Sequence, residues 1–204
     1  MHQHLTPQDT GWIEVIVGCM FSGKTEELIR RVRRAQYAHM PIAVFKAAID
    51  KRYSEDSVDS HSGMQVTSFL IRKSSDIPEL VGNAAVVGID EAQFFDMELP
   101  DVCDHLANEG RRVVVAGLDL DYRGNPFGPM PKLLCQAEYI QKMLAICVAC
   151  GNPADRSQRV VNRAAQVLVG EKDAYEARCR KHWDPENFDM VQQQLPFGPN
   201  LAEF

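Results

Sequence analysis

The feature that most constrains the fold is a glycine-rich run, Gly18 to Thr25, which reads Gly-Cys-Met-Phe-Ser-Gly-Lys-Thr and fits the phosphate-loop pattern G-x-x-x-x-G-K-[ST]. In such a loop, glycines let backbone N–H groups turn inward around phosphate oxygens. The lysine reaches the β- and γ-phosphates, and the final hydroxyl ligates Mg²⁺. The apolar run Trp12 to Val17 predicts a buried strand before the loop, and a helix from about Lys24 to His39 would add its positive N-terminal end. The alternative is a glycine turn that binds no ligand.

Alternating apolar segments indicate a parallel α/β sheet. Further buried strands are predicted at Ile42 to Ile49, Ala84 to Ile89 and Arg112 to Ala116, and Leu99 to Glu109 should form a helix that Gly110 closes. Two segments read as loops, the polar stretch Asp50 to Gly63 and the Gly- and Pro-rich stretch Leu118 to Pro131. The second should lie near the carboxyl ends of the strands, where open α/β sheets bind ligands.

Length, composition and charge limit the classes of protein to which the chain can belong. The chain has 204 residues, of which 45% are hydrophobic and 25% charged, which fits one core plus a small appendage. No apolar run approaches the ~18 residues of a membrane span, and the N-terminus lacks a secretory pattern, so we expect a cytoplasmic protein with no membrane partner. The net charge of −6 argues against a nucleic-acid partner. The basic run Arg30 to Arg34 is interpreted as a solvated helix face, with nucleic-acid contact as the alternative.

The composition shifts at about Cys147, which predicts three parts. We expect a P-loop nucleotide-binding domain at 12–146, a zinc subdomain with a substrate-covering loop at 147–184, and a poorly ordered tail at 185–204.

Two adjacent carboxylates, Asp90 and Glu91, follow the predicted strand Ala84 to Ile89. Opposite a phosphate loop, Asp90 would hold Mg²⁺ directly or through water. The alternative for Asp90 is a helix cap or a loop acid. Glu91 could activate water in a hydrolase, take a proton from a substrate hydroxyl in a kinase, or be a solvated loop residue.

Four soft ligands occur as two pairs. Cys147 and Cys150 have C-x₂-C spacing, and Cys179 and His182 have C-x₂-H spacing. Four such ligands with no open position describe a closed tetrahedral zinc site, structural rather than catalytic. The metal would tie together the ends of the intervening loop. The alternative is free cysteines, and Cys19, Cys103 and Cys135 are expected to be small core or loop residues.

Small, apolar and hydroxyl-bearing residues between the zinc ligands suit a lid over an apolar pocket. Aromatic residues also follow two predicted strand ends, in the segments Phe94–Phe95 and Tyr122–Phe127. For any one of these aromatic residues, packing in the core is the alternative. Their joint placement favours a planar ligand.

Together these motifs resemble the type II thymidine kinases, the zinc-containing cytosolic family, from about Ile13 to His182. The resemblance is carried by Gly-x-Met-Phe-Ser-Gly-Lys-Thr at Gly18–Thr25, Asp-Glu-Ala-Gln-Phe-Phe at Asp90–Phe95, Pro-Phe-Gly at Pro126–Gly128, and the paired zinc ligands. It implies a RecA-like parallel sheet flanked by helices, with a small C-terminal zinc-binding subdomain carrying a lasso-type lid loop. The implied reaction transfers the γ-phosphate of ATP to the 5′-hydroxyl of thymidine, giving dTMP for nucleotide salvage and DNA synthesis. Family members are commonly homotetramers that dTTP inhibits.

The resemblance also assigns residues. Glu91 would be the catalytic base, and Thr25 and Asp90 would serve Mg²⁺. The ATP and phosphate site would comprise Gly18, Cys19, Met20, Phe21, Ser22, Gly23, Lys24, Thr25, Asp90, Glu91, Ala92 and Gln93. The nucleoside site would comprise Met20, Phe94, Leu118, Tyr122, Phe127, Ser157, Leu168, Gly170 and Tyr175, with Arg52 near the phosphates.

Three positions depart from the family pattern. His182 stands where some members have a fourth cysteine, which keeps tetrahedral zinc plausible. Cys19 occupies a position often held by proline, which implies a less rigid loop that is open to oxidation. Ser157 replaces the threonine of some members, which leaves the tolerance of bulky 5-substituents open.

A rival interpretation is a nucleic-acid-dependent ATPase of the helicase type, because Asp90 to Gln93 also resembles an acidic helicase box. That class needs two RecA-like domains and a basic track, and this acidic chain of 204 residues has room for neither. The zinc pairs could alternatively belong to a nucleic-acid-binding module.

Overall fold

The protein is a three-layer α/β structure in a computed structural model that describes residues 10–48, 57–59, 65–160 and 174–186. Six strands form the central sheet in the order β5-β2-β6-β7-β1-β8, and each pair of neighbours runs parallel. The strands are β1 (Trp12–Val17), β2 (Ile42–Ala47), β5 (Phe69–Ile71), β6 (Val86–Asp90), β7 (Arg112–Gly117) and β8 (Tyr139–Lys142). The predicted parallel α/β sheet is therefore confirmed.

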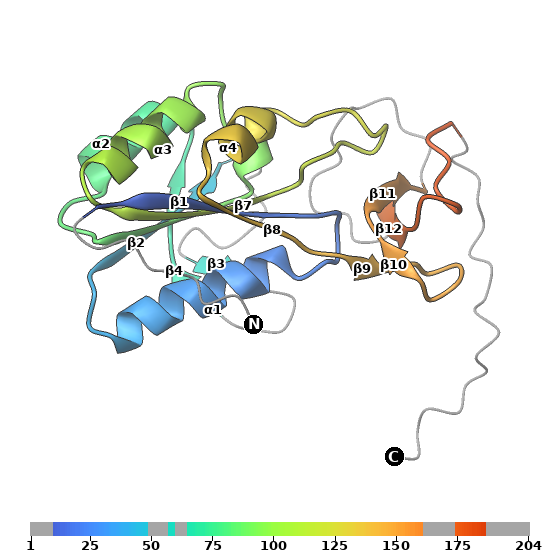
Figure 1. The fold of residues 1–204 in the computed structure, drawn as a ribbon, viewed down its shortest axis with the longest axis horizontal. Coiled ribbons are helices and arrows are strands. Elements are labelled where there is room, and N and C mark those ends of the chain that lie inside the picture. The colour runs from blue at the N-terminus through green and yellow to red at the C-terminus, as the bar shows by residue number, and fades with distance from the viewer. Residues whose placement is uncertain (1–9, 49–56, 60–64, 161–173, 187–204) are drawn as a thin grey trace, which may run out of the picture.

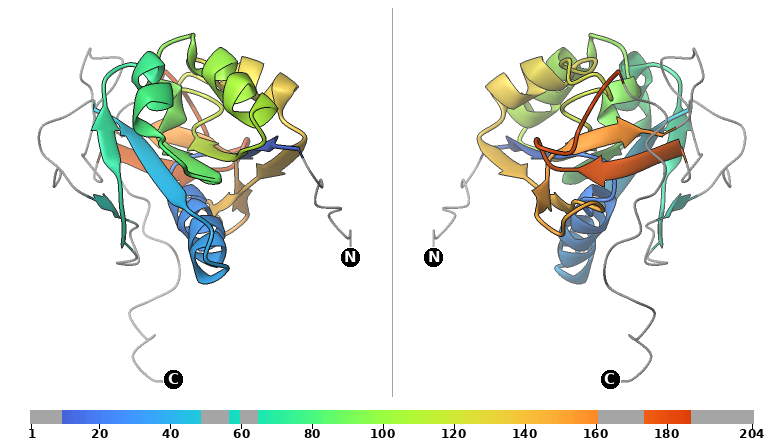
Figure 2. Two further views of the ribbon diagram at one scale, coloured as in Figure 1. Left: turned by 90° about the vertical axis from the view of Figure 1, so that its left-hand side faces the viewer. Right: turned by 90° about the vertical axis from the view of Figure 1, so that its right-hand side faces the viewer.

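Helices cover both faces of this sheet. α1 (Lys24–Tyr37) lies on one face, and α2 (Ile77–Leu80), α3 (Leu99–Asn108) and α4 (Met130–Gln136) lie on the other (Figures 1 and 2). Two short 3₁₀ turns, η1 (Ser74–Asp76) and η2 (Ala92–Phe94), complete the connections.

The alternation of side chains along β1 divides the core in two. Val15 and Val17 pack under α2, α3 and α4, whereas Ile16 packs against α1 with Leu28 and Val32. Both faces of the sheet are thus apolar, as parallel strands require.

The segment from residue 145 onward forms a separate group of short strands. They are β9 (Ala145–Ile146), β10 (Pro153–Ala154), β11 (Arg156–Arg159) and β12 (Tyr175–Arg178). β9 pairs with β10, and β11 pairs with β12, both antiparallel. This group lies beyond the carboxyl ends of the sheet strands, on the same side as the start of α1 (Figure 1).

Several elements end at residues other than those predicted. α1, β2 and α3 end one or two residues before the predicted limits, at Tyr37, Ala47 and Asn108. The predicted loop 118–131 overlaps the first turn of α4, whose Pro131 is tolerated because the first helical N–H groups have no intrahelical partner.

The stretch predicted as a loop from Asp50 to Gly63 contains a strand. β3 (Ser57–Asp59) pairs antiparallel with β4 (Gln65–Thr67), and Val58 faces Val66 in register. Three-residue strands with one apolar position each carry too little periodicity to be predicted.

The arginine-rich part of α1 is not a purely solvated face. Arg31 donates to Glu14 on β1 at 2.6 Å and to Glu27 at 2.8 Å, and its side chain is only 13% exposed. Arg30 also pairs with Glu27, at 2.6 Å. Arg30 and Arg31 therefore neutralise carboxylates of the chain itself.

Candidate functional site

The glycine-rich loop joins β1 to α1 and bends through left-handed backbone conformations. φ is 148° at Gly18, 64° at Phe21 and 81° at Gly23. A Cβ on Gly18 would lie 2.3 Å from the carbonyl oxygen of Met143, so only glycine fits there. The Ser22 hydroxyl donates to the Cys19 carbonyl at 2.8 Å, which ties the loop across itself. The backbone is thus shaped to turn N–H groups toward an anion.

The cationic and hydroxyl groups of the loop lie beside the acidic end of β6. The Lys24 ammonium donates to the Cys19 carbonyl at 2.7 Å. The Thr25 hydroxyl oxygen lies 3.3 Å from each carboxylate oxygen of Asp90, which is almost fully buried. A hydroxyl and a carboxylate in contact at the start of a helix are the oxygen ligands that Mg²⁺ takes beside nucleotide phosphates.

Burial and neighbouring charges shift the pKa values of Asp90 and Lys24. Burial raises the pKa of Asp90 to about 7, and the negative charge of Glu91 adds to the effect, while Lys46 and Lys24 oppose it. Burial also lowers the pKa of Lys24, against the attraction of Glu91. A carboxylate that is costly to ionise in the protein alone gains strongly from a divalent cation.

We predict that Asp90→Asn stabilises the metal-free protein at pH 8. Since the pKa of Asp90 is about 7 when folded and lower when unfolded, the folded state binds more protons between these values. The free energy of unfolding therefore falls as pH rises from about 4 to about 7. The melting temperature of Asp90→Asn should exceed that of the wild type by several degrees at pH 8, and this gap should narrow as pH falls toward 4. A gap that did not change with pH would contradict this origin.

Glu91 stands at the junction between β6 and η2 in a left-handed conformation, with φ 53°. The amide nitrogen of Gln93 donates to Oε2 of Glu91 at 2.7 Å. A non-glycine residue at positive φ is uncommon and marks a place where surrounding contacts fix the backbone. The carboxylate is half-buried and follows directly on Asp90.

Residues predicted to surround a nucleoside come together from separate segments. Met20 packs with Tyr122 and Tyr175, and its N–H donates to the Ser157 hydroxyl at 3.0 Å. The rings of Phe94 and Phe127 meet edge to face, with centroids 5.5 Å apart. The N–H of Leu118 donates to the side chain of Gln93, the residue before Phe94, at 2.9 Å. Arg52, Leu168 and Gly170 lie outside the described residues.

Arg159 on β11 holds the two tyrosines of this group together. Its guanidinium lies 3.7 Å from the ring centroid of Tyr122 and 5.3 Å from that of Tyr175. It also donates to the Tyr175 hydroxyl at 2.7 Å, and it is only 1% exposed. A buried guanidinium over aromatic faces fixes the positions of both rings.

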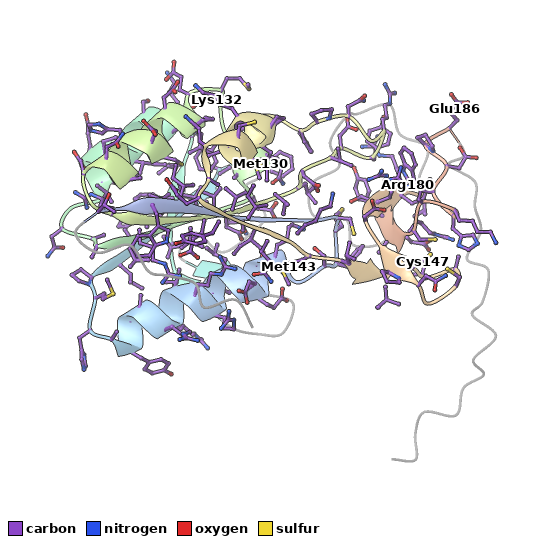
Figure 3. The ribbon with its side chains drawn as sticks, in the orientation of Figure 1. Met130, Lys132, Met143, Cys147, Arg180 and Glu186 are labelled. Carbon is purple, nitrogen blue, oxygen red and sulfur yellow. The ribbon has the colours of Figure 1, made fainter. Side chains whose placement is uncertain are left out.

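The four predicted metal ligands converge. Their ligand atoms lie within 4.8 Å of one another. The Sγ atoms of Cys150 and Cys179 are 3.8 Å apart, and Nδ1 of His182 lies 3.8 Å from Sγ of Cys147 and 3.3 Å from Sγ of Cys179. A tetrahedral zinc site has edges of about 3.8 Å between sulfurs and about 3.5 Å between sulfur and nitrogen. The group therefore fits a closed tetrahedral metal ion, at the end of the molecule where Figure 3 labels Cys147.

Hydrogen bonds lower the pKa of one of the four candidate ligands, Cys147, and so favour the form that binds metal. Burial acts to raise the pKa of the Cys147 thiol, but hydrogen bonds from the backbone at Cys179 and Ala149 and from the side chains of His182 and Cys150 lower it to about 6. The thiolate is the form that binds metal.

The other cysteines differ in their surroundings. Cys19 is buried against Ala154, whose carbonyl accepts from its thiol at 3.3 Å, and Cys103 is fully buried in α3. Cys135, by contrast, is an exposed residue of α4 and belongs neither to the core nor to a loop. This corrects the expectation for Cys135, since a helix face at this position turns toward solvent.

Besides Arg159, sequence reasoning missed three charged residues at the site. Lys46 is the register partner of Asp90 on β2. Asp119 is only 9% exposed, adds a negative charge that acts on Lys24, and accepts from Lys142 of β8 at 2.7 Å. Asp119 could have been found from its place just after the predicted strand Arg112 to Ala116. Lys46 and Lys142 could be assigned to the site only once the strand order was known.

A parallel sheet with a phosphate loop after β1 and a buried carboxylate at the end of β6 defines a P-loop nucleotide-binding protein, here with an appended group of four residues that could hold a metal ion. The family model for thymidine kinase matches residues 11–183, so the chain belongs to the thymidine kinase family. It is thus an ATP-dependent nucleoside kinase.

Curated relatives agree with this assignment. The thymidine kinase of Rhodothermus sp. (strain ITI 518) is 54% identical over 175 residues, covering 86% of this chain and 82% of that protein. The thymidine kinase of Bdellovibrio bacteriovorus is 54% identical over 177 residues, covering 86% of this chain and 87% of that protein. Among solved structures, the genome packaging NTPase B204 of Sulfolobus turreted icosahedral virus 2 matches with a TM-score of 0.44 at 16% identity, over 65% of this chain and 75% of that one. None of the described helices combines the length and the apolar character that crossing a bilayer would require.

Proposed function

We propose that this chain transfers the γ-phosphate of ATP to the 5′-hydroxyl of thymidine and releases dTMP and ADP. The observation that carries the proposal is the contact between Thr25 and Asp90 at 3.3 Å, with Glu91 as the next residue. A loop for phosphates, an oxygen pair for magnesium and a carboxylate for the acceptor proton stand together. These are the parts that phosphoryl transfer to an alcohol requires.

The phosphate side of the site would work through positions Gly18 to Thr25. Inward N–H groups of this loop and the Lys24 ammonium bind the β- and γ-phosphates, and Thr25 and Asp90 hold the magnesium that accompanies ATP. Asp119 and its partner Lys142 adjust the charge around Lys24.

Glu91 would act as the general base. Its carboxylate takes the proton of the 5′-hydroxyl while that oxygen bonds to the γ-phosphorus. The bond from this phosphorus to the β,γ-bridging oxygen breaks, and the electron pair leaves with ADP. Because the transition state is loose, positioning of the acceptor oxygen matters as much as proton removal.

The nucleoside would lie against Met20, Tyr122, Ser157 and Tyr175, which pack together across the junction of the sheet and the strands β11 and β12. Phe94, Leu118 and Phe127 would complete the nucleoside site, together with Leu168 and Gly170, which lie outside the described residues. Arg52, also outside the described residues, would act near the phosphates, as the family resemblance implies.

The remaining family properties follow as proposals. Zinc in the Cys₃His group is structural, and residues 12–146, 147–184 and 185–204 form the nucleotide-binding domain, the zinc subdomain and a tail. The protein is cytoplasmic and tetrameric, and dTTP inhibits it.

We predict that thymidine is used far better than purine deoxynucleosides, because a lid that closes on a planar base with aromatic residues would leave little room for a second fused ring. Phosphate transfer from ATP should be measured across thymidine, deoxyuridine, deoxycytidine, deoxyadenosine and deoxyguanosine. The kcat/KM for thymidine should exceed that for deoxyguanosine by at least about 10²-fold. Equal turnover of thymidine and deoxyguanosine would contradict the predicted specificity. The absence of any nucleoside-dependent transfer would contradict the proposed kinase function.

A further inference from the structure

Gln93 is a buried residue of the acidic segment whose side chain bonds both to Glu91 and to the residue after β7. Only 2% of it is exposed. Its amide nitrogen donates to Oε2 of Glu91 at 2.7 Å, and its amide oxygen accepts from the N–H of Leu118 at 2.9 Å. One side chain therefore links the end of β6 to the residue that follows β7.

Two glycines make room for this link. A Cβ on Gly117 would lie 2.8 Å from Oε1 of Gln93, and a Cβ on Gly128 would lie 2.3 Å from its backbone carbonyl oxygen. Gly128 also has a left-handed φ of 49°, as expected at the turn that ends the Pro-Phe-Gly loop. Gln93 is consequently held on its backbone and at its amide, with little freedom to change rotamer.

The bond that Gln93 makes is directed at one oxygen of Glu91. A hydrogen bond to Oε2 restricts rotation of the carboxylate, and Oε1 is then the oxygen that would accept the proton of a substrate hydroxyl. The left-handed backbone of Glu91 is costly for a side chain with a Cβ, so the contacts around it must keep it in place.

We propose that Gln93 is a positioning residue that orients the Glu91 carboxylate through its amide N–H, and that it does not bind ATP phosphates. This inference rests on the proposed role of Glu91 as base. It differs from the phosphate-binding role that the family resemblance implies for Gln93. Displacing a reacting group by about 1 Å can cost about 10²-fold in rate, which sets the scale of the effect.

The test is a double-mutant cycle between the two residues. Gln93→Glu keeps an oxygen to accept from Leu118 but replaces the N–H donor with a second carboxylate that repels Glu91. Glu91→Gln combined with Gln93→Glu restores a donor and an acceptor with reversed polarity. Should Gln93→Glu fail to fold, Gln93→Met removes the amide at nearly constant volume and completes the same cycle.

We expect Gln93→Glu to lower kcat by about 10- to 10²-fold, with the KM for ATP and for thymidine within about threefold of wild type. In the Glu91→Gln background the same change should lower kcat no further, and the melting temperature lost in Gln93→Glu should return in the double variant. Fully additive losses of kcat would overturn the positioning role while leaving Glu91 as base. A large rise in the KM for ATP at unchanged kcat would overturn it in favour of phosphate binding. The proposed function fails separately, if Glu91→Gln alone keeps the wild-type kcat.

Discussion

Removing the proposed zinc from the Cys₃His group is expected to disorder the short strands β9 to β12 and to weaken thymidine binding strongly. The ligands come from the turn at Cys147–Cys150 and the turn at Cys179–His182, and each is closed by backbone hydrogen bonds such as Gly151 N–H to Cys147 at 2.8 Å and His182 N–H to Cys179 at 3.0 Å. Within this region the described residues belong to only two small apolar clusters, so a bound metal would supply much of the folding free energy. In small zinc domains that contribution is about 10–16 kcal/mol.

Removal of the metal should also disturb the phosphate loop, because two residues of that loop bond to the zinc subdomain. Cys19 donates to the carbonyl of Ala154 at 3.3 Å, and the N–H of Met20 donates to the Ser157 hydroxyl at 3.0 Å. Cys19 also belongs to the apolar cluster around Cys147 and Cys179. We therefore expect the KM for thymidine to rise most and the KM for ATP to rise as well, while the sheet stays folded.

Cys150→Ser tests this, with Cys135→Ser as the matched control, because Cys135 is an exposed cysteine of α4 far from the ligand group. Cys150→Ser should lower the melting temperature by at least about 5 °C and raise the KM for thymidine at least about tenfold, and the control should change neither. Metal analysis of protein purified without chelators should give about one zinc per chain. Protein without zinc that kept full activity would refute the structural role.

Local patterns predicted the parts of the fold that depend on near neighbours in sequence. The phosphate loop, β1 and α1 follow from glycine spacing and apolar periodicity, and the metal group follows from two short ligand pairs. β8 could not be predicted, because its four residues are half or fully exposed at a sheet edge and lack apolar alternation.

Contacts between the ends of neighbouring strands could not be predicted from the sequence either. Gln93 reads as one more residue of an acidic motif until β6 and β7 are known to be neighbours, since its link to Leu118 spans 25 residues. The ion pair of Asp119 with Lys142 depends in the same way on where β8 joins the sheet. These interactions are set by strand order, which periodicity does not encode.

Glu91→Gln is expected to lower kcat by roughly 10²–10⁴, which is the usual contribution of a positioned general base. The amide keeps the shape of the side chain but cannot take the proton of the 5′-hydroxyl. Because Lys24, Thr25 and Asp90 remain, ATP and thymidine should bind with nearly normal affinity. Glu98→Gln is the matched control, since Glu98 is an exposed carboxylate between η2 and α3.

Loss of ATP binding in Glu91→Gln would instead mean that Glu91 shares the magnesium with Asp90. The division of roles between the two carboxylates would then be wrong.

The most direct measurement follows γ-labelled ATP through a single turnover with excess enzyme, in the presence and absence of thymidine. Wild-type protein should place the label on the 5′-oxygen of thymidine and release almost none as inorganic phosphate. Glu91→Gln should bind both substrates and transfer the label roughly 10²–10⁴ times more slowly. Label released as phosphate regardless of thymidine, and faster with single-stranded DNA, would contradict the nucleoside kinase account.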